Sequence, residues 1–163
     1  MKSFMAIVAV MCLLIMGSCA QKVNRDLEKA NVKLAIDQML KALETEDMDL
    51  ISKTTAHDTD MVNFGTDATE RWVGWESFQE AARKQFEVFE NTKMTVMDQV
   101  IKIHDSGKVA WYSEVVDMET TAKGQPVSLK GARLTGVFEK RNGNWIAIQS
   151  HFSVPVSGQA APY

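Results

Sequence analysis

The stretch that decides the fold runs from Arg133 to Ser153 and reads RLTGVFEKRNGNWIAIQSHFS. Apolar and polar residues alternate on both sides of Asn142-Gly143, a dipeptide that commonly joins two antiparallel strands. The alternation predicts two strands, Leu129 to Lys140 and Asn144 to Val154, each with one apolar face and one polar face. We therefore expect a β-hairpin that belongs to an antiparallel sheet.

A three-residue loop, Arg141-Asn142-Gly143, sets the expected register of this hairpin, because it pairs Lys140 with Asn144. A tighter two-residue turn would pair Glu139 with Ile146 and mix the apolar and polar faces, so we reject it. The chosen register predicts an apolar face that packs on helices, with these opposed pairs: Phe138 and Ile146, Gly136 and Ile148, Ala132 and Phe152.

The other face of the hairpin gathers polar side chains together with Trp145. Its expected members are Arg133 opposite His151, Thr135 opposite Gln149, and Ser153 nearby. Directly opposed side chains lie within about 5 Å at Cβ, so these residues form one polar patch on the outer sheet surface. The patch is either the seam of a homodimer, which we favour, or a ligand or acid/base site around His151.

Upstream of the hairpin the sequence has the periodicity of helices. Apolar residues recur at three- and four-residue steps across residues 22–44, which predicts an amphipathic helix. A second, shorter helix is expected from Met48 to Thr55 with Asp47 as its N-cap. Gly74 leads into a third helix, from Glu76 to Phe89, with aromatic residues along one side.

Strands make up most of the remaining chain. Met61 to Phe64 is expected to be a short strand, while Met94 to Ile103 and Val109 to Thr120 are long and rich in β-branched residues. Helices first and strands afterwards indicate an α+β domain, in which the helices cover one face of an antiparallel sheet.

Two motifs carry a resemblance to a known family. The first is His57-Asp58-Thr59-Asp60-Met61-Val62-Asn63-Phe64-Gly65, followed by Gly74-Trp75-Glu76-Ser77-Phe78, and the second is the closing hairpin around Asn142-Gly143-Asn144-Trp145. Across residues 22–156 the chain resembles the SnoaL-like branch of the nuclear transport factor 2-like superfamily. The resemblance implies a cone-shaped fold, with three N-terminal helices packed on a curved antiparallel sheet, and a sheet face that commonly forms a homodimer.

Activity does not follow from this resemblance, because the superfamily hosts isomerases, dehydratases, hydrolases, cyclases and plain association domains. A steroid-isomerase-like member would need a tyrosine in the first helix, and this chain has only Tyr112 and Tyr163. The hairpin also resembles that of the association domain of calcium/calmodulin-dependent protein kinase II. However, Gly136 and Phe152 stand where that domain would have arginines.

Asp60 and Glu114 are the candidate catalytic residues. Asp60 precedes the first strand, where the resemblance implies that an acid or base can stand at the cavity mouth; the alternative, which we favour, is a turn-capping role. Glu114 shares strand parity with Tyr112. If that face points inward, Glu114 is a buried carboxylate and a candidate acid or base; if it points outward, Glu114 is solvated.

Ligand-binding candidates are residues that could line or rim an apolar pocket. They are His57, Trp72, Trp75 and Tyr112. Aromatic residues at helical spacing usually belong to a core, but Trp72 and Trp75 are irregularly placed and are expected near a cavity mouth.

The N-terminus reads as an export signal. Lys2 precedes the apolar run Phe4 to Met16, and Met16-Gly17-Ser18-Cys19 resembles a bacterial lipobox. We expect a signal peptide at residues 1–18, cleavage before Cys19 and acylation of that cysteine; the alternative is simple secretion after cleavage at Ala20. The folded domain would span residues 22–156, followed by a frayed tail at 157–163.

Charge and motif content exclude several other classes. Cleavage before Cys19 leaves 17 basic and 21 acidic residues, a net charge of −4, which argues against nucleic-acid binding. The three histidines lack metal-ligand spacing, and no cofactor motif is present, so neither a metal nor a cofactor is expected.

These observations predict an exported homodimer, held at the bacterial cell envelope by a lipid on Cys19, with a pocket for a small, mostly apolar molecule. Two alternatives stay open. One is an isomerase, dehydratase or hydrolase that uses an inward carboxylate, and the other is a pure association domain.

Overall fold

The structure, a computed structural model, describes residues 23–158 and residue 161. The expected signal peptide (residues 1–18), the lipidation candidate Cys19 and much of the expected tail lie outside the described residues. Within the described part, no helix has the length and apolar character needed to cross a membrane.

Local side-chain contacts start the first two helices. Helix α2 (Arg25–Thr45) begins after Asn24, whose Oδ1 accepts a hydrogen bond from the Leu27 backbone N–H at 3.2 Å. Helix α3 (Met48–Thr54) begins after Asp47, whose Oδ1 accepts from the Leu50 N–H at 2.9 Å. Asp47 is therefore the N-cap that the sequence predicts, and it satisfies a backbone donor that the helix leaves free.

Helix α4 (Trp75–Phe86) begins after Gly74, where both conformation and space require glycine. Gly74 has a φ of 79°, and a Cβ there would lie 2.9 Å from the carbonyl oxygen of Thr59. The helix ends at Phe86 rather than at the predicted Phe89, because Phe89 already belongs to the following strand.

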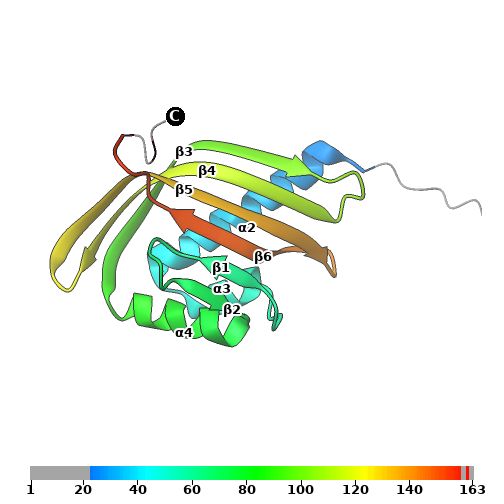
Figure 1. The fold of residues 1–163 in the computed structure, drawn as a ribbon. Coiled ribbons are helices and arrows are strands. Elements are labelled where there is room, and N and C mark those ends of the chain that lie inside the picture. The colour runs from blue at the N-terminus through cyan, green and yellow to red at the C-terminus, as the bar shows by residue number, and fades with distance from the viewer. Residues whose placement is uncertain (1–22, 159–160, 162–163) are drawn as a thin grey trace, which may run out of the picture.

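Six strands form one sheet in the order β2-β1-β6-β5-β4-β3. They are β1 (Val62–Phe64), β2 (Arg71–Val73), β3 (Phe89–Ile103), β4 (Val109–Ala122), β5 (Gln125–Arg141) and β6 (Asn144–Ser153). β1 runs parallel to β6, and the other pairings among these six strands are antiparallel. Strand β2 has only three residues and was not predicted. Figure 1 shows α2 running across one face of the long strands, with α3 and α4 gathered beside β1 and β2. The expected α+β architecture is confirmed.

The β5–β6 turn has two residues, so the predicted three-residue loop is wrong. Asn142 and Gly143 both have positive φ, 51° and 87°, as a type I′ turn requires. Arg141 pairs with Asn144 as a result. Asn-Gly is the dipeptide that this turn favours, and its twist matches that of the flanking strands.

A β-bulge at Ile148 keeps the apolar side chains of β5 and β6 on the same face of the hairpin. Phe138 pairs with Ala147 rather than Ile146, and the next pair is Val137 with Gln149. The extra residue reverses the alternation in mid-strand. The two-residue turn is therefore compatible with one continuous apolar face.

The remaining predicted pairs shift accordingly. Gly136 pairs with Ser150, Leu134 with Phe152, Thr135 with His151, and Arg133 with Ser153. The predicted pairs of Gly136 with Ile148, Ala132 with Phe152, Arg133 with His151 and Thr135 with Gln149 are wrong. The polar patch still lies on the face away from the helices, but Trp145 does not belong to it, because Trp145 is buried in the core at 5% exposure.

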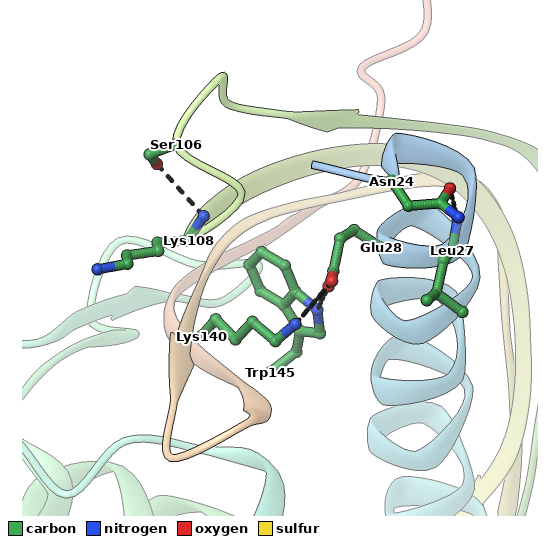
Figure 2. A network of polar contacts seen from close by, with 7 residues as sticks. All are labelled: Asn24, Leu27, Glu28, Ser106, Lys108, Lys140 and Trp145. Atoms are coloured by element: carbon green, nitrogen blue, oxygen red, sulfur yellow. Dashed lines mark hydrogen bonds and ion pairs between the residues drawn. The ribbon is translucent and has the colours of Figure 1, made fainter. Parts of the chain in front are cut away.

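The core fills the space between α2 and the helix-covered face of the sheet, which we call the inner face. Val32 and Ile36 of α2 and Phe138 of β5 are fully buried there. A polar clasp closes one end of this core (Figure 2). Glu28 of α2 accepts hydrogen bonds from Lys140 Nζ at 2.7 and 2.8 Å and from Trp145 Nε1 at 2.9 Å. The clasp joins the start of α2 to the β5–β6 hairpin.

Candidate functional site

A cavity of about 320 Å³ lies between the helices and the inner face of the sheet. Its wall combines residues of α2, α3 and α4 with residues of all six strands, and includes Leu43, Phe78, Phe86, Leu129, Leu134 and Phe152. The volume is at the lower end of the range for small-molecule sites, which is about 300–1,000 Å³. The cavity therefore has room for one small molecule.

The wall is mostly apolar and offers little free charge. Its polar side chains come from Thr66, Glu70, Gln85, Thr92 and Ser150. Glu70 is the one ionisable side chain that the described residues contribute to the wall. Its Oε2 accepts hydrogen bonds from the Thr66 N–H, from Thr66 Oγ1 at 3.1 Å and from the Asp67 N–H at 3.2 Å. Glu70 is thus engaged in holding the turn between β1 and β2.

The structure separates the residues that the sequence places near the cavity mouth. Trp72 lines the cavity and makes an edge contact with Phe78, with ring centroids 6.2 Å apart. His57 stacks on Trp75 at 4.1 Å, and this stack is not part of the wall. Asp60 is exposed and also lies outside the wall. Of these four candidates, only Trp72 faces the cavity.

Glu114 points inward, which resolves the strand parity that the sequence left open. It is 3% exposed, and Gln99 Nε2 donates a hydrogen bond to its Oε2 at 2.7 Å. Burial raises the pKa of the Glu114 carboxyl above its ordinary value, and the hydrogen bond from Gln99 only partly opposes this. Glu114 is not in the cavity wall, but its partner on β5, Leu134, is.

Tyr112 lies one inward position before Glu114 and is also 3% exposed. Its ring packs against Phe138 with centroids 5.6 Å apart. Burial, and secondarily the negative charge of Glu114, raises the pKa of the Tyr112 hydroxyl, so the group stays protonated and can donate a hydrogen bond.

Sequence reasoning missed two polar residues at the sheet side of the cavity, Asn63 and Ser150. Ser150 lines the cavity, and its hydroxyl donates to Asn63 Oδ1 at 2.7 Å. Asn63 is 3% exposed. The sequence does hold one signal for this pair, the side-chain amide of Asn63 inside the otherwise apolar stretch Met61–Phe64. A polar group that is buried there needs a hydrogen-bond partner.

The outer face of the sheet is a second surface. Phe64, which also belongs to the cavity wall, makes an edge contact with His151 at 5.6 Å and is 39% exposed. Trp111 and Val100 are 47% and 46% exposed on neighbouring strands. Residues 23–158 contain no cluster of three or more His, Cys, Asp or Glu side chains that could hold a metal ion.

A family model described as "SnoaL-like domain" matches residues 32–157. The chain therefore belongs to the SnoaL-like domain family. No curated protein matches the sequence.

Solved structures share the fold at low sequence identity. A superfamily protein from Salmonella enterica serovar Typhimurium LT2 has a TM-score of 0.74 at 16% identity, covering 85% of this chain and 99% of that chain. A provisionally named dehydratase from Streptomyces avermitilis has a TM-score of 0.73 at 15% identity, with coverages of 81% and 99%. A protein of unknown function from Pseudomonas putida KT2440 has a TM-score of 0.65 at 16% identity, with coverages of 78% and 87%. These similarities confirm the fold.

Proposed function

We propose that this protein binds one small, uncharged and mostly apolar molecule in the cavity between α4 and the inner face of the sheet. The cavity itself carries the proposal, because a space of about 320 Å³ lined by apolar side chains favours a ligand of matching character. Burial of apolar ligand surface contributes about 25 cal/mol per Å². A bicyclic aromatic molecule could therefore bind without forming any ion pair.

Binding without chemistry is favoured over catalysis because the described part of the chain contributes no free acid or base to the wall. The Glu70 carboxylate accepts hydrogen bonds from backbone N–H groups of the turn that it stabilises. The two candidate catalytic residues, Asp60 and Glu114, both lie outside the wall. A charged ligand would also meet no compensating cation among the lining side chains.

Fluorescence titration with N-phenyl-1-naphthylamine, a neutral probe that brightens in apolar surroundings, tests the proposal. The wild-type protein should bind one probe per chain. Ala82→Phe should abolish binding, because Ala82 is 5% exposed and its side chain borders the cavity. Ser77→Phe, which adds the same ring to an exposed position of α4, is the matched control and should bind normally. Equal binding by wild type and Ala82→Phe would contradict the cavity as the site.

Acid/base catalysis by Glu114 is the second candidate function. Its burial beside the lining residue Leu134 and its raised pKa favour it over the exposed Asp60. A carboxyl group whose pKa is raised by burial is better suited to act as a general acid or base than a solvated one. Incubation with a panel of β-hydroxy ketones, followed by NMR, would detect loss of water. Turnover that disappears in Glu114→Gln would support this function, and turnover that persists would exclude Glu114 from the chemistry.

We further propose that the outer face of the sheet forms a homodimer. Trp111, Val100 and Phe64 leave apolar surface exposed there, and the polar patch around Thr135 and His151 offers hydrogen-bonding groups beside it. A specific interface typically buries about 800 Å² on each partner, and its core is enriched in aromatic residues.

Export and lipid anchoring complete the proposal. The apolar run before Cys19 and the lipobox-like Met16-Gly17-Ser18-Cys19 support a location at the bacterial cell envelope, with the domain outside the cytoplasm. Mass spectrometry of the mature N-terminus should find an acylated Cys19, and Cys19→Ala should release the protein from membranes. An N-terminus that begins after Ala20 would indicate simple secretion instead.

A further inference from the structure

Three buried polar side-chain atoms on the inner sheet face have no hydrogen-bond partner among the described residues. Two of them, Asn63 Nδ2 and Tyr112 Oη, are donors, and the third, Glu114 Oε1, is a carboxyl oxygen. Each belongs to a side chain that is 3% exposed. Buried polar groups are nearly always paired, so an unpaired group near a cavity indicates a place where a ligand atom could bind.

One cross-strand row brings the two side chains toward each other. Asn63 on β1 pairs with Ser150 on β6, Ser150 pairs with Gly136 on β5, and Gly136 pairs with Tyr112 on β4. Adjacent strands lie about 4.8 Å apart, so the backbones of Asn63 and Tyr112 are separated by three such steps. Their side chains must cover most of that distance.

The Tyr112 ring extends over Gly136 on the neighbouring strand and so spans one of these steps. A Cβ on Gly136 would lie 2.7 Å from Tyr112 Cε1 and 3.3 Å from Cζ, so the hydroxyl end of the ring lies over this glycine, whose partner on the next strand is Ser150. Asn63 approaches Ser150 from the other side, since Ser150 Oγ donates to Asn63 Oδ1 at 2.7 Å. In the cross-strand row Ser150, which lines the cavity, therefore lies between Asn63 and the glycine that the Tyr112 ring covers.

We propose that Asn63, Tyr112 and Ser150 form a polar end of the cavity, which binds a single neutral oxygen of the ligand. This inference rests on the proposed binding function and narrows its ligand class to small apolar molecules that carry a carbonyl or hydroxyl group. Asn63 Nδ2 and Tyr112 Oη both donate, so together they suit one oxygen acceptor. Rotation of the Ser150 side chain about Cα–Cβ opens the path from the cavity to these donors.

The chemistry of the surroundings selects a neutral oxygen over a carboxylate. Burial keeps the pKa of Tyr112 high, so its hydroxyl remains a neutral donor. Glu114 lies beside it on β4, and the described residues that line the cavity include no lysine or arginine. An anion would therefore be desolvated without a compensating positive charge. An ordered water molecule would offer the same oxygen chemistry, and the experiment must separate these two sources.

Calorimetric titration with 2-naphthol and naphthalene tests the proposal, because the two probes differ by one hydroxyl group. Wild type should bind 2-naphthol about tenfold more tightly, as expected for one well-placed hydrogen bond. Tyr112→Phe should bring the two affinities to within about twofold of each other while naphthalene binding is retained. Thr54→Val is the matched control, since it deletes a buried hydroxyl that is bonded to the Leu50 carbonyl, and it should keep the preference.

Each other outcome has a definite meaning. Equal affinity of wild type for both probes would overturn the polar end while leaving the apolar pocket intact. Equal affinity together with a lower melting temperature of Tyr112→Phe would assign the oxygen to a bound water instead. Binding of neither probe would overturn the proposed function as well. If Tyr112→Phe does not fold, Ser150→Ala replaces it and should reduce the preference for 2-naphthol; an unchanged preference would overturn the proposal.

Discussion

The ring of Tyr112 lies over the backbone of Gly136 on the neighbouring strand, in the space that a side chain would occupy. A Cβ at residue 136 would approach Tyr112 Cε1 to 2.7 Å and the Gln149 carbonyl oxygen to 2.6 Å. The φ angle of Gly136 is not in the left-handed region, so crowding rather than conformation requires the glycine. This contact holds the hydroxyl end of the tyrosine ring over β5.

Gly136→Ala should therefore destabilise the protein, because either Tyr112 or β6 must move. We expect the free energy of unfolding to fall by about 1 to 3 kcal/mol, as for other overpacked cores. Chemical denaturation measures this change. Thr135→Ala, the adjacent outward-facing position, is the control and should lose less than about 1 kcal/mol. A Gly136→Ala variant as stable as wild type would show that the ring does not lie on the glycine.

Glu114 should make stability depend on pH. Its folded pKa is raised by burial above the ordinary value of 4.5, so the folded state holds the proton more tightly than the unfolded state. The contribution of Glu114 is fully present below about pH 4.5 and is lost as pH rises through the folded pKa, with a slope approaching about 1.4 kcal/mol per pH unit. Glu114→Gln should remove this loss. Glu119→Gln, on the same strand but exposed and paired with Lys130, should not. If the free energy of unfolding changed with pH in the same way in wild type and in Glu114→Gln, the result would contradict burial of the Glu114 carboxyl group.

The clasp around Glu28 should be important for stability (Figure 2). Its side chain is 13% exposed and accepts hydrogen bonds from both Lys140 and Trp145. Glu28→Ala leaves a half-buried ammonium and a buried indole N–H without their partner, which should cost about 2 to 3 kcal/mol. Thermal unfolding measures the effect. Glu80→Ala removes an exposed pair with Lys84 on α4 and should change the melting temperature little. Similar losses for both variants would refute the special role of the clasp.

A dimer through the outer face should depend on Trp111. Trp111→Glu places a charge at the centre of the proposed interface and should weaken dimerisation by about 2 kcal/mol or more, as for aromatic residues at interface centres. Sedimentation velocity over a concentration series reports the change. Leu34→Glu, at a 57% exposed position on α2, is the control and should leave association unchanged. A wild-type protein that remains monomeric at high concentration would refute the interface.

Local patterns were sufficient to predict the architecture but not the register. Periodicity identified the three helices and the long strands, and the Asp47 cap follows from one side chain and one backbone donor. The predicted register of the hairpin was wrong because the alternation around Asn142-Gly143 fits a three-residue loop when no bulge is considered. The bulge at Ile148 makes the two-residue turn compatible with the same faces, and its position depends on packing rather than on a local motif.

The polar end of the cavity could not be predicted for a different reason. Asn63 and Ser150 are 87 residues apart and meet only because β1 pairs in parallel with β6. Parallel pairing between distant strands leaves no signal in local periodicity. Trp72 was predicted to lie near the cavity without knowledge of β2, the strand that positions it.

A crystal structure of the protein with 2-naphthol would test the central claim most directly, since it shows where the molecule binds. We predict one 2-naphthol in the cavity, with its rings between α4 and β5 and its oxygen near Ser150, Asn63 and Tyr112. Density for the probe on the outer sheet face, or a cavity closed by its own side chains with no probe inside, would contradict a binding function for this cavity.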